Sequence, residues 1–489
     1  MLFKKKYIFK VLLLGMLVGV PGTSYVVDIE AKESTGGAKK MESSISSLGV
    51  ADAFIYVKGY EWGPGVPKVI LQMNQEISQI EEVECSIFTA GAERKITDIF
   101  LSTPKGAKAE GASSYLTIEM ETTYKTSGSP FFLQVETMHN KWMETYEVII
   151  DGKIKANDKE VSLAFQKDCI SQRVCEDTEL FAFRDTYSGK YENPHTKELE
   201  ELTLQIAAYE PESLSGGEKN PLLIWLHGQG EGGTDADIAI LGNEVTALAK
   251  EEIQKYFHAG SETGAYVLAV QTPTYWMDEG DGTNGEGSGI SKYSEILMDA
   301  IQDYVNKRED IDTDRIYIGG CSNGGYMTMN MLIQNADYFA AAYPVCEAYS
   351  FYEREKSELT ERRWFTDEKV EQIKNKPVWF TVSIDDTVVN PVNFVLPAYR
   401  ELLLAGAENA WLSVFETVEG EDDVNAAYMG HWSWIYLFNN QVTRVQNPET
   451  VKKSEDTKYF GTIPSNEGGG NQQAEMYENI FEWLNAQSN

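Results

Sequence analysis

The chain has 489 residues, a length typical of two or three domains rather than one. Hydrophobic residues make up 42% and aromatic residues 11%, which is enough to fill real cores and excludes a disordered chain. The formal net charge of −34, from 76 acidic and 42 basic residues, disfavours nucleic acid and anionic membranes as partners. We interpret this charge mainly as a contribution to solubility.

The N-terminus has the pattern of an export signal. Four lysines among the first ten residues precede an apolar run over residues 11–20, which is too short for the ~20 residues that a bilayer requires. We predict a signal peptide over residues 1–31, cleaved between Gly22 and Ala31, and a flexible leader over residues 32–49. The mature chain is expected to be secreted, without stable membrane insertion; an uncleaved anchor is the alternative.

Five cysteines, an odd number, cannot all pair within the chain. Cys169 and Cys175 are close enough in sequence to close a small loop in an oxidising compartment, and the state of Cys321 and Cys346 stays open. No Cys-x-x-Cys or Cys/His cluster indicates zinc. We expect neither a metal nor an organic cofactor.

Residues 50–180 show short apolar–polar alternation that is typical of β-strands. These runs are rich in β-branched and aromatic residues, and Gly, Pro, Asn and Ser separate them, whereas helical periodicity is nearly absent. The expected strands cover residues 53–57, 68–73, 84–88, 115–120, 131–135 and 144–150. This pattern predicts an all-β antiparallel sandwich.

Residues 181–489 follow a different pattern, in which buried strands alternate with amphipathic helices. Strands are expected at residues 221–226, 265–270, 315–320, 340–345, 377–383 and 411–417. Helices are expected at residues 238–257, 293–307, 323–334, 392–404 and 472–486, and residues 447–471 are expected to form an inserted loop. Alternating strands and helices predict a mostly parallel sheet flanked by helices.

Gly320-Cys321-Ser322-Asn323-Gly324 matches the Gly-x-Ser-x-Gly pattern of a nucleophilic serine. A buried strand precedes it and a helix follows it, which is the setting that this motif requires. The two glycines are needed because a Cβ at either position would collide with a neighbouring segment. We predict Ser322 as the nucleophile; an ordinary Gly-rich turn is the alternative.

A second Gly-rich segment, residues 227–233 (HGQGEGG), directly follows the first buried strand. Loops of this type supply an oxyanion-stabilising N–H group. We therefore predict the backbone N–H groups of Gln229 and Asn323 as the oxyanion donors. His227 is expected to hold this loop in place rather than to act as a base.

A serine nucleophile needs a base, and imidazole is the usual one. Of the five histidines, only His431 lies beyond the last expected strand, where the order Ser, Asp, His places the base. Asp386, after strand 377–383, is predicted to orient His431, with Asp385 as the alternative. Trp276 and Trp432 are candidates to line the substrate pocket, with core or rim packing as the other interpretation.

These motifs together resemble bacterial esterases that carry an N-terminal immunoglobulin-like domain ahead of an α/β-hydrolase domain. The resemblance rests on residues 60–66 (YEWGPGV), 225–233 (WLHGQGEGG), 320–325 (GCSNGG) and 430–434 (GHWSW). It implies carboxylesterase activity on short acyl chains, and a role of the immunoglobulin-like domain in assembly and in the shape of the active-site region. The catalytic part also resembles prolyl-oligopeptidase-type and polyhydroxybutyrate-depolymerase-type hydrolases. Gln229 departs from the family pattern, in which a third glycine is common.

The expected function is therefore hydrolysis of a small ester through Ser322, His431 and Asp386. A serine peptidase of prolyl-oligopeptidase-like type and a carbohydrate or feruloyl esterase are the alternatives, and a non-catalytic binding protein is disfavoured by the complete set of residues. A homo-oligomer is possible.

Overall fold

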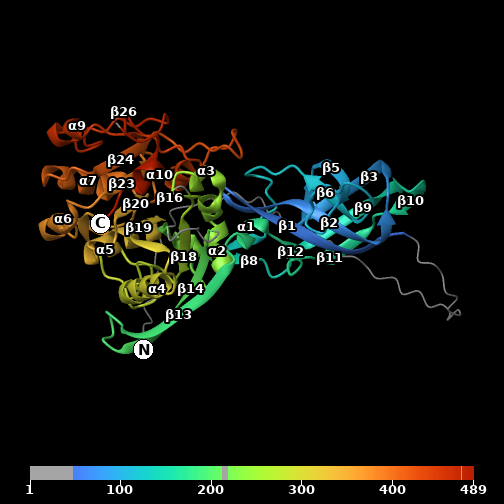
Figure 1. The fold of residues 1–489 in the computed structure, drawn as a ribbon, viewed down its shortest axis with the longest axis horizontal. Helices are drawn as coiled ribbons and strands as arrows, with labels where there is room; N and C mark the ends of the chain where they lie inside the picture. Colours follow the sequence, from blue (N-terminus) through green and yellow to red (C-terminus); the bar gives the residue numbers. More distant parts are fainter. Residues whose placement is uncertain (1–47, 212–217, 261, 475) are drawn as a thin grey trace, which may run out of the picture. The chain divides into compact units, whose positions relative to one another are not determined.

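The computed structural model describes residues 48–489, apart from residues 212–217, 261 and 475. The predicted signal peptide and all but the last two residues of the predicted leader lie outside this range. The described chain contains a β-sandwich followed by a larger domain of helices and strands (Figure 1).

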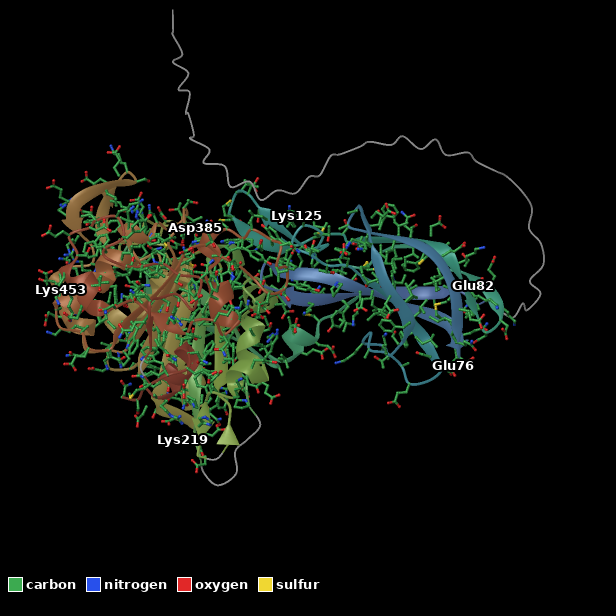
Figure 2. All side chains as sticks on the ribbon, turned by 90° about the horizontal axis from the view of Figure 1, so that it is seen from above. Glu76, Glu82, Lys125, Lys219, Asp385 and Lys453 are labelled. Carbon is green, nitrogen blue, oxygen red and sulfur yellow. The ribbon has the colours of Figure 1, made fainter. Side chains whose placement is uncertain are left out.

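The predicted antiparallel β-sandwich is confirmed by two five-stranded sheets, in the orders β12-β1-β2-β6-β5 and β10-β9-β3-β4, with β11 also paired to β9 and with β1–β12 as a short parallel pair. Alternate side chains of each strand point into the core of the sandwich. On β1, for example, Ala53, Ile55 and Val57 are fully buried while the residues between them are not. The strands are β1 (Val50–Tyr60), β2 (Gly63–Ile77), β3 (Ile80–Thr89), β4 (Ala92–Arg94), β5 (Ile96–Ser102), β6 (Ser113–Met120), β9 (Glu147–Ala156), β10 (Lys159–Ser162), β11 (Phe165–Asp168) and β12 (Arg173–Val174). Acidic side chains such as Glu76 and Glu82 are exposed on this domain (Figure 2).

The strand expected at residues 131–135 forms a separate hairpin rather than part of the sandwich. β7 (Phe131–Gln134) and β8 (His139–Trp142) pair only with each other in the sheet topology. The indole N–H of Trp142 donates to Asp235, 2.9 Å away, in the following domain. This hairpin therefore joins the β-sandwich to the segment after the 227–233 loop.

The second domain contains an eight-stranded sheet in the order β13-β14-β18-β15-β19-β20-β23-β24. The predicted mostly parallel sheet is confirmed for β18 to β24, whereas β13 and β14 add an antiparallel edge that the sequence pattern did not indicate. The strands are β13 (Phe183–Glu192), β14 (Leu199–Tyr209), β15 (Asn220–Leu226), β18 (Tyr266–Gln271), β19 (Ile311–Cys321), β20 (Ala341–Val345), β23 (Val378–Ser383) and β24 (Ala410–Phe415).

Helices cover both faces of this sheet. Two separate clusters of buried side chains divide them: α4, α5, α6, α7 and α9 contribute to one, and α2, α3, α8 and α10 to the other. Their bounds are α2 (Ala236–Leu241), α3 (Glu251–Gln254), α4 (Ser294–Asn306), α5 (Asn323–Gln334), α6 (Asp367–Ile373), α7 (Val395–Leu404), α8 (Trp434–Phe438), α9 (Pro448–Lys453) and α10 (Ile480–Asn485); α1 (Glu176–Glu179) links the two domains. Three two-stranded sheets complete the described fold: β16–β17 (His258–Ala259, Glu262–Thr263), β21–β22 (Tyr352–Glu355, Glu358–Arg363) and β25–β26 (Arg444–Val445, Gln472–Gln473).

Three predicted segments differ from the structure. The helix expected at residues 238–257 is broken into α2, a 3₁₀ turn and α3, because Glu244 adopts a left-handed φ of 58° and Gly242 packs against Glu231. The helix expected at residues 472–486 begins only at Ile480, where the side chain of Asn479 caps it. The loop expected at residues 447–471 contains α9.

All five cysteines are free thiols, so the loop closure considered for Cys169 and Cys175 is not formed. Burial raises the pKa of both thiols to about 11. No helix in the described part of the chain is long and apolar enough to cross a membrane.

Candidate active site

Ser322 lies at the sharp turn between β19 and α5, as the Gly-x-Ser-x-Gly pattern predicts. Its φ of 54° is a strained value for a residue with a side chain. A Cβ on Gly324 would lie 1.9 Å from the carbonyl oxygen of Leu226, and a Cβ on Gly320 would lie 2.5 Å from the same atom. Both glycines are therefore required by close backbone approach, and the turn holds Ser322 partly exposed.

The 227–233 loop follows β15, which pairs with β19 so that Leu226 lies opposite Gly320. β15 lies between β18 and β19, the point at which the strand order reverses and at which α/β sheets bind ligands. Gln229 begins a 3₁₀ turn (Gln229–Glu231), and Asn323 is the first residue of α5. N–H groups in a first helical turn lack intrahelical partners, which leaves that of Asn323 available to an anion.

His431 lies between Ser322 and Asp386. Its Nε2 is 2.9 Å from Ser322 Oγ, and its Nδ1 is 2.7 Å from Asp386 Oδ2. The other oxygen of Asp386 accepts hydrogen bonds from the backbone N–H groups of Val388 (2.8 Å) and Val389 (2.9 Å). Asp386 is 3% exposed and His431 8%, so the pair is largely shielded from water. The structure thus brings together the three side chains predicted from the sequence.

Asp385, the alternative acid, has a different position. Its Oδ1 accepts a hydrogen bond from Ser383 Oγ at 2.6 Å. A Cβ on Gly430 would lie 2.2 Å from this same oxygen, so Asp385 packs directly against the backbone that precedes His431. Asp385 therefore supports the loop of the histidine, whereas Asp386 contacts its ring (Figure 2 labels Asp385).

His227 holds the 227–233 loop, as predicted. The backbone N–H of Thr272 donates to its Nε2 at 3.1 Å, so the proton must be on Nδ1, which lies 2.6 Å from the carbonyl oxygen of Gly228. Burial lowers the pKa of His227 to about 4. His227 is therefore a neutral structural residue at ordinary pH.

Asn284 is a site residue that sequence reasoning missed. Its Nδ2 donates to Gln229 Oε1 at 3.2 Å, and its Oδ1 accepts from Asn323 Nδ2 at 2.6 Å. The side chain of Asn284 thus bridges the two residues predicted as oxyanion donors. It belongs to a Gly-rich stretch, residues 278–289, and no local pattern there indicated a partner 39 residues away.

The two tryptophans proposed for the substrate pocket lie in different environments. Trp276 has no exposed surface and packs in the core against His227 and Tyr293, with ring centroids 5.3 and 6.2 Å apart. Trp276 is therefore a core residue that packs against the first residue of the 227–233 loop and does not line an open pocket. Trp432 is partly exposed beside His431 and contacts Tyr124 of the β-sandwich edge to face, at 5.8 Å.

Two buried carboxyl groups lie near the site. Burial raises the pKa of Glu231, in the 227–233 loop, to about 7, and its Oε1 accepts a hydrogen bond from Asn140 of β8 at 3.2 Å. Burial also raises the pKa of Glu347 to about 8. Glu347 packs closely against Gly325 of α5. A Cβ on Gly325 would lie 2.7 Å from the Cα of Glu347. Burial thus favours the neutral form of both groups.

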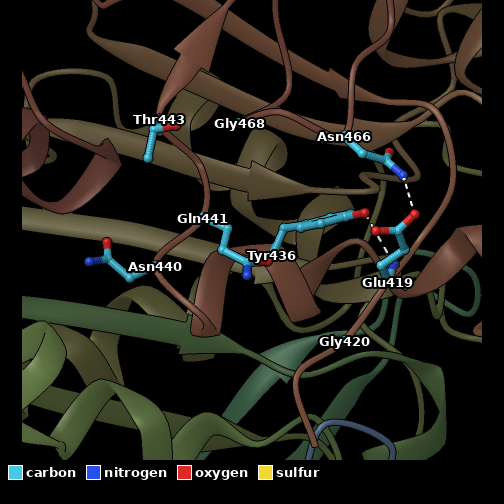
Figure 3. A pocket seen from close by; sticks show the side chains of 8 residues that line it. All are labelled: Glu419, Gly420, Tyr436, Asn440, Gln441, Thr443, Asn466 and Gly468. Atoms are coloured by element: carbon cyan, nitrogen blue, oxygen red, sulfur yellow. Dashed lines mark hydrogen bonds between the residues drawn. The ribbon is translucent and has the colours of Figure 1, made fainter. Parts of the chain in front are cut away.

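A polar cavity of about 350 Å³ borders the segment between β24 and His431 (Figure 3). It is lined by Glu419, Gly420, Tyr436, Asn440, Gln441, Thr443, Asn466 and Gly468, and by none of Ser322, His431 or Asp386. No cluster of three or more His, Cys, Asp or Glu side chains in the described residues is arranged to hold a metal ion.

Comparisons with known proteins agree with this architecture. Residues 54–163 match the model of the esterase Ig-like N-terminal domain, and residues 289–391 match that of the prolyl oligopeptidase family. A solved structure of a thermostable esterase covers 90% of this chain and 100% of its own, with 21% identity and a TM-score of 0.61. An acylaminoacyl peptidase from Pyrococcus horikoshii (15% identity, 80% and 55% coverage) has a TM-score of only 0.34. No curated protein matches the chain.

The thermostable esterase supports the fold, and the two family models cover the sandwich and the segment that contains Ser322. Residues 54–163 therefore resemble an esterase-type Ig-like N-terminal domain, residues 289–391 resemble the prolyl oligopeptidase family within a domain of α/β-hydrolase fold, and these matches indicate a serine hydrolase.

Proposed function

We propose that the chain is an exported carboxylesterase that hydrolyses small, short-chain esters through Ser322, His431 and Asp386. The observation that carries this proposal is the continuous hydrogen-bond path from Ser322 Oγ through His431 to Asp386, at 2.9 and 2.7 Å. Export is proposed from the basic and apolar pattern of the first 20 residues.

In the acylation step, Ser322 Oγ attacks the ester carbonyl while His431 Nε2 takes the hydroxyl proton. The negative charge that develops on the carbonyl oxygen is stabilised by the N–H groups of Gln229 and Asn323, each of which contributes about 3 kcal/mol in comparable sites. His431 then gives its proton to the leaving alcohol, and an acyl-Ser322 ester remains.

In the second step, His431 activates a water molecule that attacks this ester, and the acid is released. Asp386 accepts from His431 Nδ1 throughout, which keeps Nε2 free to accept a proton and stabilises the imidazolium. The two backbone bonds from Val388 and Val389 to the other oxygen hold the carboxylate in place.

A serine peptidase is the second candidate, because the match over residues 289–391 is to the prolyl oligopeptidase family. Ester and amide hydrolysis use the same nucleophile and base. A panel of short aryl esters, feruloyl and acetylated-sugar esters and aminoacyl amides therefore separates the candidates by kcat/KM. The esterase proposal expects hydrolysis of the esters and no measurable hydrolysis of the aminoacyl amides, and turnover of any amide would overturn it in favour of the peptidase.

The enzymatic role itself is tested with a fluorophosphonate probe, which reacts with an activated serine. We expect stoichiometric labelling of the folded chain and no labelling of Ser322→Ala. A folded wild-type chain that remains unlabelled would exclude the proposed nucleophile.

A further inference from the structure

Glu61 is a buried carboxylate that the mechanism above does not use. It lies in the turn between β1 and β2 of the β-sandwich and is 1% exposed. None of the ion pairs within the described part of the chain includes it. A buried carboxylate without a cation must be stabilised by hydrogen bonds, since its desolvation is otherwise costly.

Four donors provide this stabilisation, and all belong to the hydrolase domain. Oε1 of Glu61 accepts from the backbone N–H of Glu421 at 2.6 Å and from Asn439 Nδ2 at 2.5 Å. Oε2 accepts from the backbone N–H of Asp422 at 3.3 Å and from the hydroxyl of Tyr428 at 3.2 Å. One side chain thus connects two backbone positions after β24 with Tyr428 and with the end of α8.

These donors flank His431 in the sequence. The segment 416–429 links β24 to the 3₁₀ turn Gly430–Trp432 that contains His431, and α8 follows it directly. Gly420 allows the close approach of the carboxylate, because a Cβ there would lie 2.0 Å from Glu61 Oε2. The backbone N–H of Glu61 also donates to Asp422 Oδ2 at 3.2 Å, so the contact is reciprocal.

On the opposite side of this segment, Asn466 and Tyr436 form hydrogen bonds with residues 416–419. Glu419 and Gly420 border the polar cavity of about 350 Å³, where Glu419 accepts a hydrogen bond from Asn466 at 2.8 Å (Figure 3). Because those bonds end at residue 419 whereas Glu61 bonds residues 421, 422 and 428, the carboxylate is a main fixed point of the half of the segment nearer His431. Loss of Glu61 would also leave buried N–H groups without an acceptor.

We propose that Glu61 is a positioning residue for His431, acting through the 416–429 segment and α8. This inference rests on the proposed serine-hydrolase function. Displacement of a catalytic group by about 1 Å can cost about 100-fold in rate. Because Glu61 contacts no reacting atom, its loss should lower kcat while substrate affinity is retained.

The first test compares wild type with Glu61→Gln in the full chain, on a short aryl ester. The amide keeps the shape of the side chain but presents an N–H group to one pair of donors. We expect kcat per labelled serine to fall between about 10-fold and 100-fold, with KM within about twofold. Glu84→Gln, an exposed carboxylate of the same sandwich with 80% side-chain exposure, is the matched control and should retain wild-type kcat.

The rate of fluorophosphonate labelling gives a second readout, because it depends on His431 and not on product release. It should fall with kcat in Glu61→Gln. Labelling of wild type together with unchanged kcat in Glu61→Gln overturns the positioning role alone, whereas an unlabelled wild type overturns the proposed function.

Tyr428→Phe keeps the inference testable if Glu61→Gln does not fold. This variant removes one donor to Glu61 and should lower kcat about threefold in the wild-type background. Where Glu61→Gln does fold, the two substitutions perturb the same hydrogen-bonded group, so their effects on kcat in the double variant should be less than multiplicative. An unchanged kcat in Tyr428→Phe, or multiplicative effects in the double variant, would contradict the proposed link.

Discussion

The segment that presents Ser322 and the segment that presents His431 are held in different ways. Ser322 is fixed by residues within a few positions of it and by the ends of the two neighbouring strands, β15 through the glycines that permit close backbone contact and β20 through the bond from the N–H of Ser322 to Val345. His431 depends on distant residues: Asp386 is 45 positions away, and Glu61 bonds the preceding segment from about 360 positions away. The nucleophile therefore has a local sequence signature, whereas the base has almost none.

Because His431 depends on distant partners, we expect the largest loss of kcat when its contact with Asp386 is changed. In Asp386→Asn, an oxygen of the amide still accepts from Val388 and Val389, but the amide N–H₂ faces Nδ1 and reverses the imidazole tautomer. We expect kcat to fall about 10⁴-fold on a short aryl ester, with thermal stability little changed.

Asp385→Asn is the matched control for this change. Asp385 accepts from Ser383 and does not contact the imidazole ring of His431. The kcat of Asp385→Asn should therefore fall by less than about tenfold. Equal losses in the two variants would contradict the assignment of Asp386 as the orienting acid.

The next effect concerns Glu347, which packs against α5, and the dependence of the free energy of unfolding on pH. Burial raises the pKa of Glu347 from 4.5 to about 8, so the folded state retains a proton that the unfolded state releases between these values. Wild-type stability should therefore decrease as pH rises through this window. Glu347→Gln lacks this titration.

The experiment measures the free energy of unfolding by urea at pH 5 and pH 8.5. From pH 5 to pH 8.5, the free energy of unfolding of Glu347→Gln should rise by on the order of 3 kcal/mol relative to that of wild type. Glu84→Gln should show no such pH-dependent difference, and a constant difference for Glu347→Gln would show that its carboxyl does not titrate in this range.

Gly324→Ala tests the local backbone contacts that hold the turn of Ser322. The added Cβ would lie 1.9 Å from the carbonyl oxygen of Leu226, so β15 and α5 must separate. We expect a loss of about 2 kcal/mol or more in the free energy of unfolding, measured with denaturant, together with a loss of labelling. Gly111→Ala, where a Cβ meets nothing within 4 Å, should change stability by less than about 0.5 kcal/mol. Wild-type stability in Gly324→Ala would refute the close approach.

The smallest predicted effect is at Asn284, which joins Gln229 to Asn323. Asn284→Ala should lower kcat/KM about tenfold, less than the loss of an oxyanion donor itself, because the backbone N–H groups remain. Thr283→Ala, in the same exposed loop, is the control and should retain kcat/KM. An effect of equal size in both variants would assign the loss to the loop rather than to the bridge.

The sequence predicted the parts of the site that follow strand ends. Ser322, the 227–233 loop and His227 lie in short motifs whose constraints are local, so their positions could be inferred without the fold. His431 and Asp386 could be proposed because the order of strands limits where a base and an acid can lie. Asn284 and Glu61 could not be found, because their partners are distant and their side chains are common types.

The errors in the fold have a similar origin. The helix expected at residues 238–257 has suitable apolar spacing, but the chain leaves the helical conformation at Glu244, two residues after Gly242 contacts Glu231 of the 227–233 loop. The edge strand β13 was missed because none of its residues is buried and its apolar pattern is weak, and its pairing with β14, where Leu202, Leu204 and Ile206 alternate, was missed with it. In both cases, contacts outside the segment decided its structure.

The residue before the nucleophile gives the protein a chemical reporter. Cys321 and Cys346 are free, fully enclosed thiols, and burial raises the pKa of both well above its usual range. An alkylating reagent can reach Cys321 only when the end of β19 opens, since thiolate formation and access are both blocked in the closed state. The alkylation rate at this position, read by mass spectrometry without any substrate, therefore measures how often the nucleophile-bearing turn comes apart.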